Sequence, residues 1–223
     1  MPMFEASDYV VDRSDNQVMD MPPQYDLPKM LNQDGIAETC GFLENFKSPG
    51  FGHVSYLPEY HKAIQKVPTK VLFNIRDPRD IVIAEFEKAK TYPPNLPFFL
   101  DYLDKQEGIR VMKKADPIAE LIRFSAARWP RWLGWLQHNY VMPVKFEDLR
   151  WKTHSTVAKI AAWLSPDMPI DIDGTAQRRK PKKRNPTFRR GISGEWMVTF
   201  TSKHKKLAEE LLGEIIRELG YEV

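Results

Sequence analysis

The sequence predicts an α/β fold with a central parallel sheet flanked by helices, and three observations carry that prediction. A compact apolar run near residue 71 has the composition of a strand buried on both faces. A second run of this kind lies near residue 141, and helical patterns occupy the chain between the two. This order is typical of a parallel crossover, and 223 residues with 42% hydrophobic content can bury a substantial core.

The chain is expected to divide into an irregular N-terminal arm, residues 1–44, and a domain formed by residues 45–223. The arm holds four prolines among many Asp, Asn and Gln residues and shows neither strand nor helix periodicity. Neither a leader peptide pattern nor a long apolar run is present. The single cysteine, Cys40, can form no intramolecular disulfide, so we expect a cytoplasmic protein, and no Cys/His cluster indicates a metal.

The clearest strand covers residues 70–75, and a helix start follows it directly. Asp77 is a good N-cap, and Pro78 fits the first helical position. We therefore expect a helix from about Pro78 to Lys90. The proline-rich stretch 91–110 cannot continue that helix, and it is interpreted as a lid over a site.

The later elements follow from similar signals. The Asp116-Pro117 pair predicts a second helix start, with Pro130 interrupting the pattern and the tryptophans around it in the core. A strand is expected over residues 140–146, and then a helix through residue 164. The last helix should begin at a Thr201 cap and end near Gly220. Its predicted apolar face consists of Leu207, Leu211, Leu212, Ile215 and Leu219.

Positive charge is concentrated in one segment. The formal net charge is only +3, but eight of the thirteen residues from 178 to 190 are Lys or Arg. A solvated basic loop explains this run, and binding of a polyanion such as nucleic acid is the alternative.

Two sets of residues have the chemistry of a phosphate site. Arg76 stands at the carboxyl end of a buried strand, where open α/β sheets bind ligands, although it could instead pair with Asp77 or Asp80. Arg189 and Arg190 precede a glycine-containing loop whose amides can turn toward an anion. Both sets suit a doubly charged phosphate monoester.

Three segments and the C-terminal sequence together resemble sulfotransferases that use 3′-phosphoadenosine 5′-phosphosulfate (PAPS). In chain order these are residues 70–80 (KVLFNIRDPRD), 145–149 (KFEDL), 189–201 (RRGISGEWMVTFT) and 212–222 (LGEIIRELGYE). The resemblance covers roughly residues 45–223, and it implies a P-loop-NTPase-like sulfotransferase fold with PAPS as co-substrate and no metal.

By this resemblance, Arg76 and the Arg189-Arg190-Gly191 loop hold the 3′-phosphate of PAPS, and Phe146 lies beside the nucleotide. These assignments agree with the phosphate chemistry inferred from the residues themselves.

The resemblance also identifies a catalytic base, His53, within residues 52–58 (GHVSYLP). A histidine titrates near neutrality and can take the proton of an acceptor hydroxyl as its oxygen attacks sulfur. The alternative is an ordinary hydrogen-bonded histidine, since the chain has five, and His61 is less well placed. The family's serine eight positions after the strand arginine is Ala84 here, so one expected phosphate ligand is absent.

The family's first strand and its phosphate loop, of the type PKSGTT, are missing from the recognisable pattern. In the family, amides and a lysine of that loop hold the 5′-phosphosulfate. Residues 28–29 (PK) lack a preceding strand pattern, and residues 47–50 (KSPG) offer a substitute. We expect a sequence that begins too far downstream; a replaced loop and lost catalysis are the alternatives. No Walker-type GK[ST] occurs, which argues against ordinary ATP or GTP hydrolysis.

The leading hypothesis is therefore a truncated or impaired sulfotransferase that moves a sulfonate group to a hydroxyl or amine. The rival is a non-catalytic protein of the same fold that binds a nucleotide or polyanion. The acceptor would be a small molecule, glycan or peptide; a membrane and nucleic acid are not expected partners, and the oligomeric state is not readable. Transfer activity, binding of 3′,5′-ADP and salt-sensitive binding to nucleic acid distinguish these hypotheses.

Overall fold

The computed structural model of the chain describes six segments. They are residues 37, 40–41, 56–67, 69–91, 110–164 and 192–223. The expected arm and lid lie almost entirely outside these segments, so the predictions made for them, and the domain boundary at residue 45, remain predictions.

The described residues contain a parallel pair of strands, β1 (Val71–Ile75) and β2 (Val141–Lys145). Their register pairs Ile75 with Lys145 at the carboxyl ends. The predicted parallel crossover is therefore confirmed. Phe73 and Ile75, which point to the same face of β1, are buried, whereas Leu72 and Asn74 on the other face are only partly buried. The expected burial on both faces is thus incomplete among the described residues.

The second strand is shorter than predicted. It was expected to include Phe146, but that residue begins the short helix α10 (Phe146–Trp151). Glu147 and Asp148 fall in the first turn of α10, where carboxylates are stabilised by the free backbone amides. The sequence pattern therefore predicted a strand that is too long by one residue at each end, Tyr140 and Phe146.

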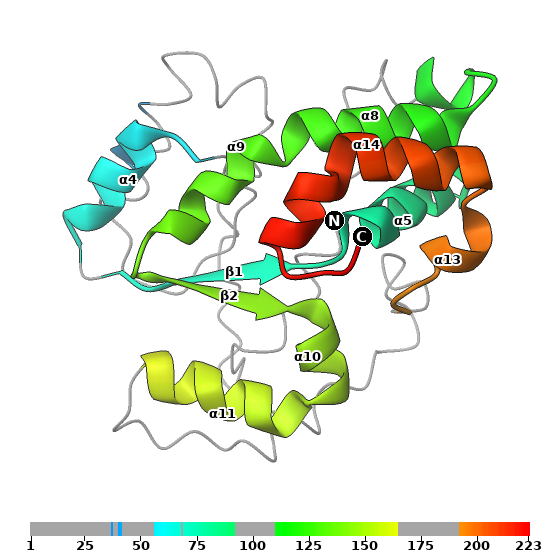
Figure 1. Cartoon of the computed structure of the whole chain (residues 1–223). Coiled ribbons are helices and arrows are strands. Elements are labelled where there is room, and N and C mark those ends of the chain that lie inside the picture. Colours follow the sequence, from blue (N-terminus) through cyan, green and yellow to red (C-terminus); the bar gives the residue numbers. More distant parts are fainter. Residues whose placement is uncertain (1–36, 38–39, 42–55, 68, 92–109, 165–191) are drawn as a thin grey trace.

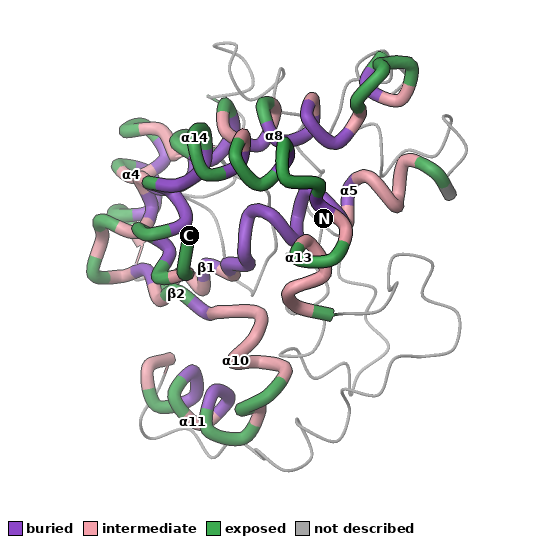
Figure 2. Tube along the Cα trace, turned by 45° about the vertical axis from the view of Figure 1, so that its right-hand side comes forward, coloured by how far each residue is buried: buried purple, intermediate pink, exposed green. Residues whose placement is uncertain are grey.

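Helices lie on two sides of the strands. On one side α5 (Pro78–Thr91), α8 (Pro117–Arg128) and α14 (Ser202–Glu218) pack against one another, and on the other lie α10 and α11 (Thr153–Leu164) (Figure 1). The shorter helices are α4 (Pro58–Gln65), α9 (Pro130–Leu133), the 3₁₀ helix η1 (Gly134–Gln137) and α13 (Trp196–Thr199). Figure 2 shows buried stretches along α5, α8 and α14.

The predicted helix starts are confirmed by their capping bonds. The Asp77 carboxylate accepts the Arg79 amide at 2.9 Å at the start of α5. The Asp116 carboxylate accepts the Ala119 amide at 3.1 Å at the start of α8. Thr201 caps α14 through the His204 amide at 3.3 Å. Each bond satisfies a backbone N–H that has no intrahelical partner, and such caps contribute about 1 kcal/mol each.

The core lies where α8 and α14 meet. Ile122, Trp129 and Leu212 are fully buried, and Trp132 is nearly so. The prediction that the tryptophans belong to the core is confirmed. One apolar residue was placed wrongly: Leu211 is 41% exposed, because the buried face of α14 runs through Ala208, Leu212, Ile215 and Ile216 and leaves Leu211 beside it.

No helix within the described segments combines the length and the apolar character needed to cross a lipid bilayer.

Candidate functional site

Arg76 and Phe146 meet at the carboxyl ends of the two strands. Because Ile75 is opposite Lys145 in the parallel register, the next residues along each strand leave the sheet side by side. The Arg76 guanidinium carbon lies 4.7 Å from the centre of the Phe146 ring. The fold thus brings together two residues that are 70 positions apart and that the sequence singled out separately.

Arg76 is only 7% exposed, and its guanidinium is only partly engaged. One Nη donates to the Ile192 carbonyl at 2.7 Å. Its Nε is buried and has no hydrogen-bond partner among the described residues. No carboxylate of the described segments forms an ion pair with Arg76, so the structural pairing considered from the sequence does not occur there.

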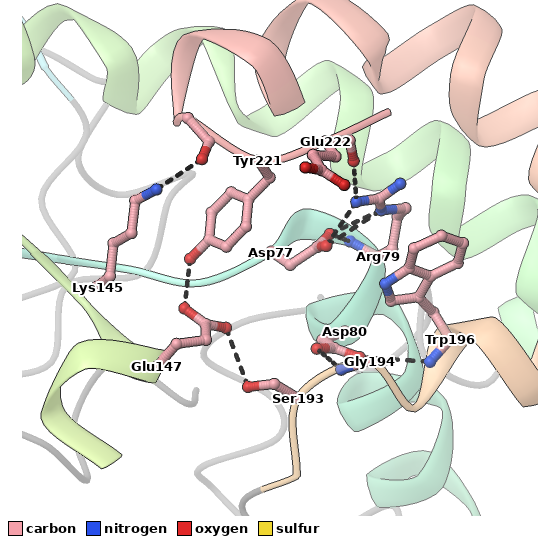
Figure 3. Close-up of polar contacts among 11 residues, drawn as sticks. Asp77, Arg79, Asp80, Lys145, Glu147, Ser193, Gly194, Trp196, Tyr221 and Glu222 are labelled. Carbon is pink, nitrogen blue, oxygen red and sulfur yellow. Dashed lines mark hydrogen bonds and ion pairs between the residues drawn. The ribbon is translucent and has the colours of Figure 1, made fainter. Parts of the chain in front are cut away.

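The carboxylate beside Arg76 has another partner. Asp77 pairs with Arg79 through contacts of 2.9 and 2.7 Å, and both side chains are buried. Arg79 also donates to the Glu222 carbonyl at 2.6 Å, and its guanidinium carbon lies 3.8 Å from the Trp196 ring centre (Figure 3). The Asp77 carboxylate thus serves both as the cap of α5 and as the partner of Arg79.

The segment that follows Gly191 docks onto the first turn of α5. The Asp80 carboxylate accepts the Gly194 amide at 2.7 Å and the Trp196 amide at 3.3 Å (Figure 3). Burial raises the pKa of the Asp80 carboxyl above its usual value, while the Gly194 amide and the positive charge of Arg76 oppose that rise. Gly194 has φ of +81°, a left-handed conformation that favours glycine.

Glu147 joins the same segment to the end of the chain. One of its oxygens accepts the Ser193 hydroxyl at 3.1 Å, and the other accepts the Tyr221 hydroxyl at 2.6 Å (Figure 3). Burial and the neighbouring carboxylate raise the pKa of Tyr221, which therefore stays a donor. Lys145 adds a bond to the Gly220 carbonyl at 2.6 Å.

Ala84 lies one helical turn after Asp80 on α5 and is partly exposed. Its methyl group can donate no hydrogen bond to a phosphate. The remaining predicted site residues, His53, Arg189, Arg190 and Gly191, lie outside the described segments. The structure therefore does not test their assignments, and it records only that Ile192, next in the chain, touches Arg76.

His61 lies at the opposite ends of the strands. Its Nδ1 is 2.7 Å from the Tyr140 hydroxyl, and its ring stacks on His138 with the ring centres 4.0 Å apart. Tyr140 directly precedes β2, so a five-residue strand, about 16 Å at 3.3 Å per residue, separates this cluster from the Arg76 end. Because His53 lies outside the described segments, the choice between His53 and His61 as base stays a prediction.

The sequence does not predict which residues hold the segment 192–196 in place. The sequence indicates Asp80 only as a possible partner of Arg76 and Glu147 only as part of the KFEDL segment, and it assigns neither of them a contact with residues 192–196. Their presence within the family-like segments was the available signal, although no spacing rule connects either of them to a segment so far along the chain. Among the described residues, no three His, Cys, Asp or Glu side chains gather as they would around a metal ion.

Comparisons with known proteins find a likeness at the level of the fold. No protein-family model matches the chain, and no curated protein matches it. Among solved structures, the crystal structure of mouse sulfotransferase SULT7A1 complexed with PAP matches with a TM-score of 0.56 at 19% sequence identity. The match covers 74% of this chain and 65% of the mouse chain, so this chain spans less than two thirds of that protein's length. The chain therefore has a sulfotransferase-like α/β fold.

Proposed function

We propose that the chain binds a 3′-phosphoadenosine nucleotide at the carboxyl ends of β1 and β2 and transfers a sulfonate group from PAPS to a hydroxyl or amine. The observation that carries the proposal is the state of Arg76. One Nη is held by Ile192, the guanidinium lies on the Phe146 ring, and the buried Nε has no partner among the described residues. An arginine that is held in place with a donor to spare suits a phosphate oxygen.

In this proposal the 3′-phosphate is bound by Arg76 together with Arg189, Arg190 and the Gly191 amide, and Phe146 contacts the nucleotide. The mouse structure supports the choice of ligand because it contains PAP. PAP is 3′,5′-ADP, the nucleotide that PAPS becomes when it gives up its sulfonate. Arg76 and Phe146 lie together at one end of the strand pair. Residues 189–191 directly precede Ile192, which contacts Arg76 at that same end.

The proposed transfer is a single displacement at sulfur. His53 removes the proton from the acceptor oxygen or nitrogen as that atom attacks the sulfur. The new bond to sulfur forms as the bond between sulfur and the 5′-phosphate oxygen breaks, and PAP leaves with the electron pair. Arg76 takes no part in these bond changes, because its place in the proposal is at the 3′-phosphate.

Calorimetric titration with PAP and with 5′-AMP tests the nucleotide site. Wild-type protein should prefer PAP, and Arg76→Ala should weaken PAP binding about tenfold to a hundredfold, since each hydrogen bond to a charged group contributes about 1.5–3 kcal/mol. Arg123→Ala is the matched control, because Arg123 is exposed on α8 and pairs with Glu120. Equal affinity of wild-type protein for PAP and 5′-AMP would refute the site.

Transfer of a labelled sulfonate from PAPS to a panel of phenols, sugars and peptides tests the reaction separately. We expect transfer by the wild-type protein and none above background by His53→Ala. Selective PAP binding without any transfer would favour the non-catalytic nucleotide-binding alternative and would reject the assignment of His53.

A further inference from the structure

Asp80 lies between Arg76 and the segment of residues 192–196, and it contacts that segment directly. Its side chain is only 1% exposed, and both carboxylate oxygens accept backbone amides, from Gly194 at 2.7 Å and from Trp196 at 3.3 Å (Figure 3). A buried carboxylate needs such donors, because an unpaired buried charge is costly.

The same junction holds the segment at a third point. Arg76, the residue directly after β1, donates to the Ile192 carbonyl at 2.7 Å, so Arg76 and Asp80 together bind one carbonyl and two amides within five residues. The Trp196 ring lies on Arg79, which comes from the same turn of α5 as Asp80. The position of the segment, and with it the orientation of the Arg76 guanidinium, therefore depends on contacts made by α5.

We infer that Asp80 is a positioning residue for the phosphate site: by holding residues 192–196 it keeps the Ile192 carbonyl against Arg76 and so orients the Arg76 guanidinium, whose Nε has no partner among the described residues, toward the 3′-phosphate. This inference rests on the proposed function. Asp80 itself is not expected to touch the nucleotide, because its oxygens already accept the two amides and a phosphate would repel its charge.

A simpler role for Asp80 would be to neutralise the charge of Arg76, which lies close enough to attract it. The two roles predict opposite results when only the charge is removed. Asp80→Asn has nearly the same shape, but its amide nitrogen cannot accept an N–H bond, so one of the two loop amides loses its partner. If Asp80 only neutralised Arg76, its removal would leave more positive field for an anion and would tighten binding.

The first experiment measures the affinities of wild type and Asp80→Asn for PAP and for 5′-AMP. We expect the ratio of PAP to 5′-AMP affinity to fall about tenfold in Asp80→Asn, in line with the loss of one hydrogen bond to a charged group. A general loss of folded protein would lower both affinities together and would leave this ratio unchanged. Glu87→Gln is the matched control, the same chemical change on α5 at a carboxylate paired with Lys90, and its ratio should stay at the wild-type value.

A second variant perturbs the segment while Asp80 remains intact. Gly194→Ala places a side chain at a φ of +81°, where only the flexible Met197 side chain lies near the new methyl group, so backbone strain is the main effect. We expect the same selective fall in the affinity ratio. This variant keeps the inference testable if Asp80→Asn does not fold.

The outcomes separate the two proposals. Wild-type protein without a preference for PAP would overturn the proposed function. If the wild-type protein prefers PAP and Asp80→Asn retains or strengthens that preference, the positioning role alone is overturned. An unchanged ratio of PAP to 5′-AMP affinity in Gly194→Ala would overturn it too. Faster hydrogen exchange of the Gly194 and Trp196 amides in Asp80→Asn, measured without ligand, is expected if the two bonds hold the segment, and unchanged exchange would contradict it.

Discussion

The two ends of the β1–β2 strand pair differ in the kind of side-chain contacts that they hold. At the carboxyl ends, charged side chains of Arg76, Asp80 and Glu147 bind backbone and hydroxyl groups of one distant segment. At the amino ends, the rings of His61, His138 and Tyr140 stack. Their polar contact is the bond between His61 and the Tyr140 hydroxyl.

The direction of the strands explains this difference. In a parallel pair the chain leaves both strands at one end, so α5 begins there, with the positive end of its dipole toward the site. At the other end α4 and η1 finish shortly before the strands begin, and they present carbonyl ends that disfavour anions. The comparison teaches that strand polarity places a helix N-terminus at one end of the strand pair and helix carboxyl ends at the other.

The largest effect should follow from breaking the buried ion pair at the carboxyl end. Arg79→Ala leaves the Asp77 carboxylate buried without its guanidinium and removes the contact with Trp196. We expect the free energy of unfolding, measured by urea denaturation, to fall by about 3 kcal/mol. The exposed pair of Arg123 with Glu120 provides the control, because Arg123→Ala should cost less than about 1 kcal/mol. Similar losses in the two variants would show that Arg79 is not held as described.

A matched pair of tyrosine substitutions sharpens the comparison, and Tyr221→Phe should have the larger effect of the two. It removes the hydroxyl that donates to Glu147 at 2.6 Å, a bond to a charged group, so the free energy of unfolding should fall by about 2 kcal/mol. Because Glu147 also holds Ser193, PAP affinity should fall a few-fold. If calorimetry shows that Tyr221→Phe binds PAP as tightly as the wild-type protein does, the C-terminal segment is not linked to the site.

Tyr140→Phe makes the same chemical change at the amino ends. It removes the bond with His61 and should lower the free energy of unfolding by about 1 kcal/mol, the usual contribution of a single hydrogen bond. Burial raises the pKa of Tyr140 to about 12, so the hydroxyl is protonated in the conditions of the measurement. PAP affinity should remain at the wild-type value, and a change in it would mean that the two ends are not independent.

The smallest effect concerns pH at the amino ends. Burial, and then the neighbouring His61, lower the pKa of His138 below its ordinary value of 6.5. His138 therefore binds a proton more readily in the unfolded chain than in the folded protein. Its contribution to the free energy of unfolding is present above pH 6.5 and is lost as the pH falls below that value. Urea denaturation from pH 7.5 to 5.5 should show wild type losing stability relative to His138→Gln. A constant difference between the two proteins across this range would disprove the effect.

The local elements were predictable because their signals lie within a few residues of one another. Asp77-Pro78 and Asp116-Pro117 mark helix starts through bonds that span two or three residues, and the structure has both. The predictions were wrong where burial depends on tertiary contacts. Leu211 fits the apolar spacing of α14 but faces outward, because the orientation of that helix is set by its contact with α8.

Phe146 was singled out by the resemblance, and the spacing pattern placed it inside the second strand. By itself, the sequence determined the parallel strand pair, the helices that follow it and Arg76, which stands where the first strand ends. Those features depend on composition and spacing along short stretches of chain. The tertiary structure alone decided that Asp80 and Glu147 hold residues 192–196, and that Arg76 bonds to Ile192 instead of to a nearby carboxylate. These contacts join groups 46 to 116 positions apart, and their partners are chosen by which helix turn and which loop the packed core brings together.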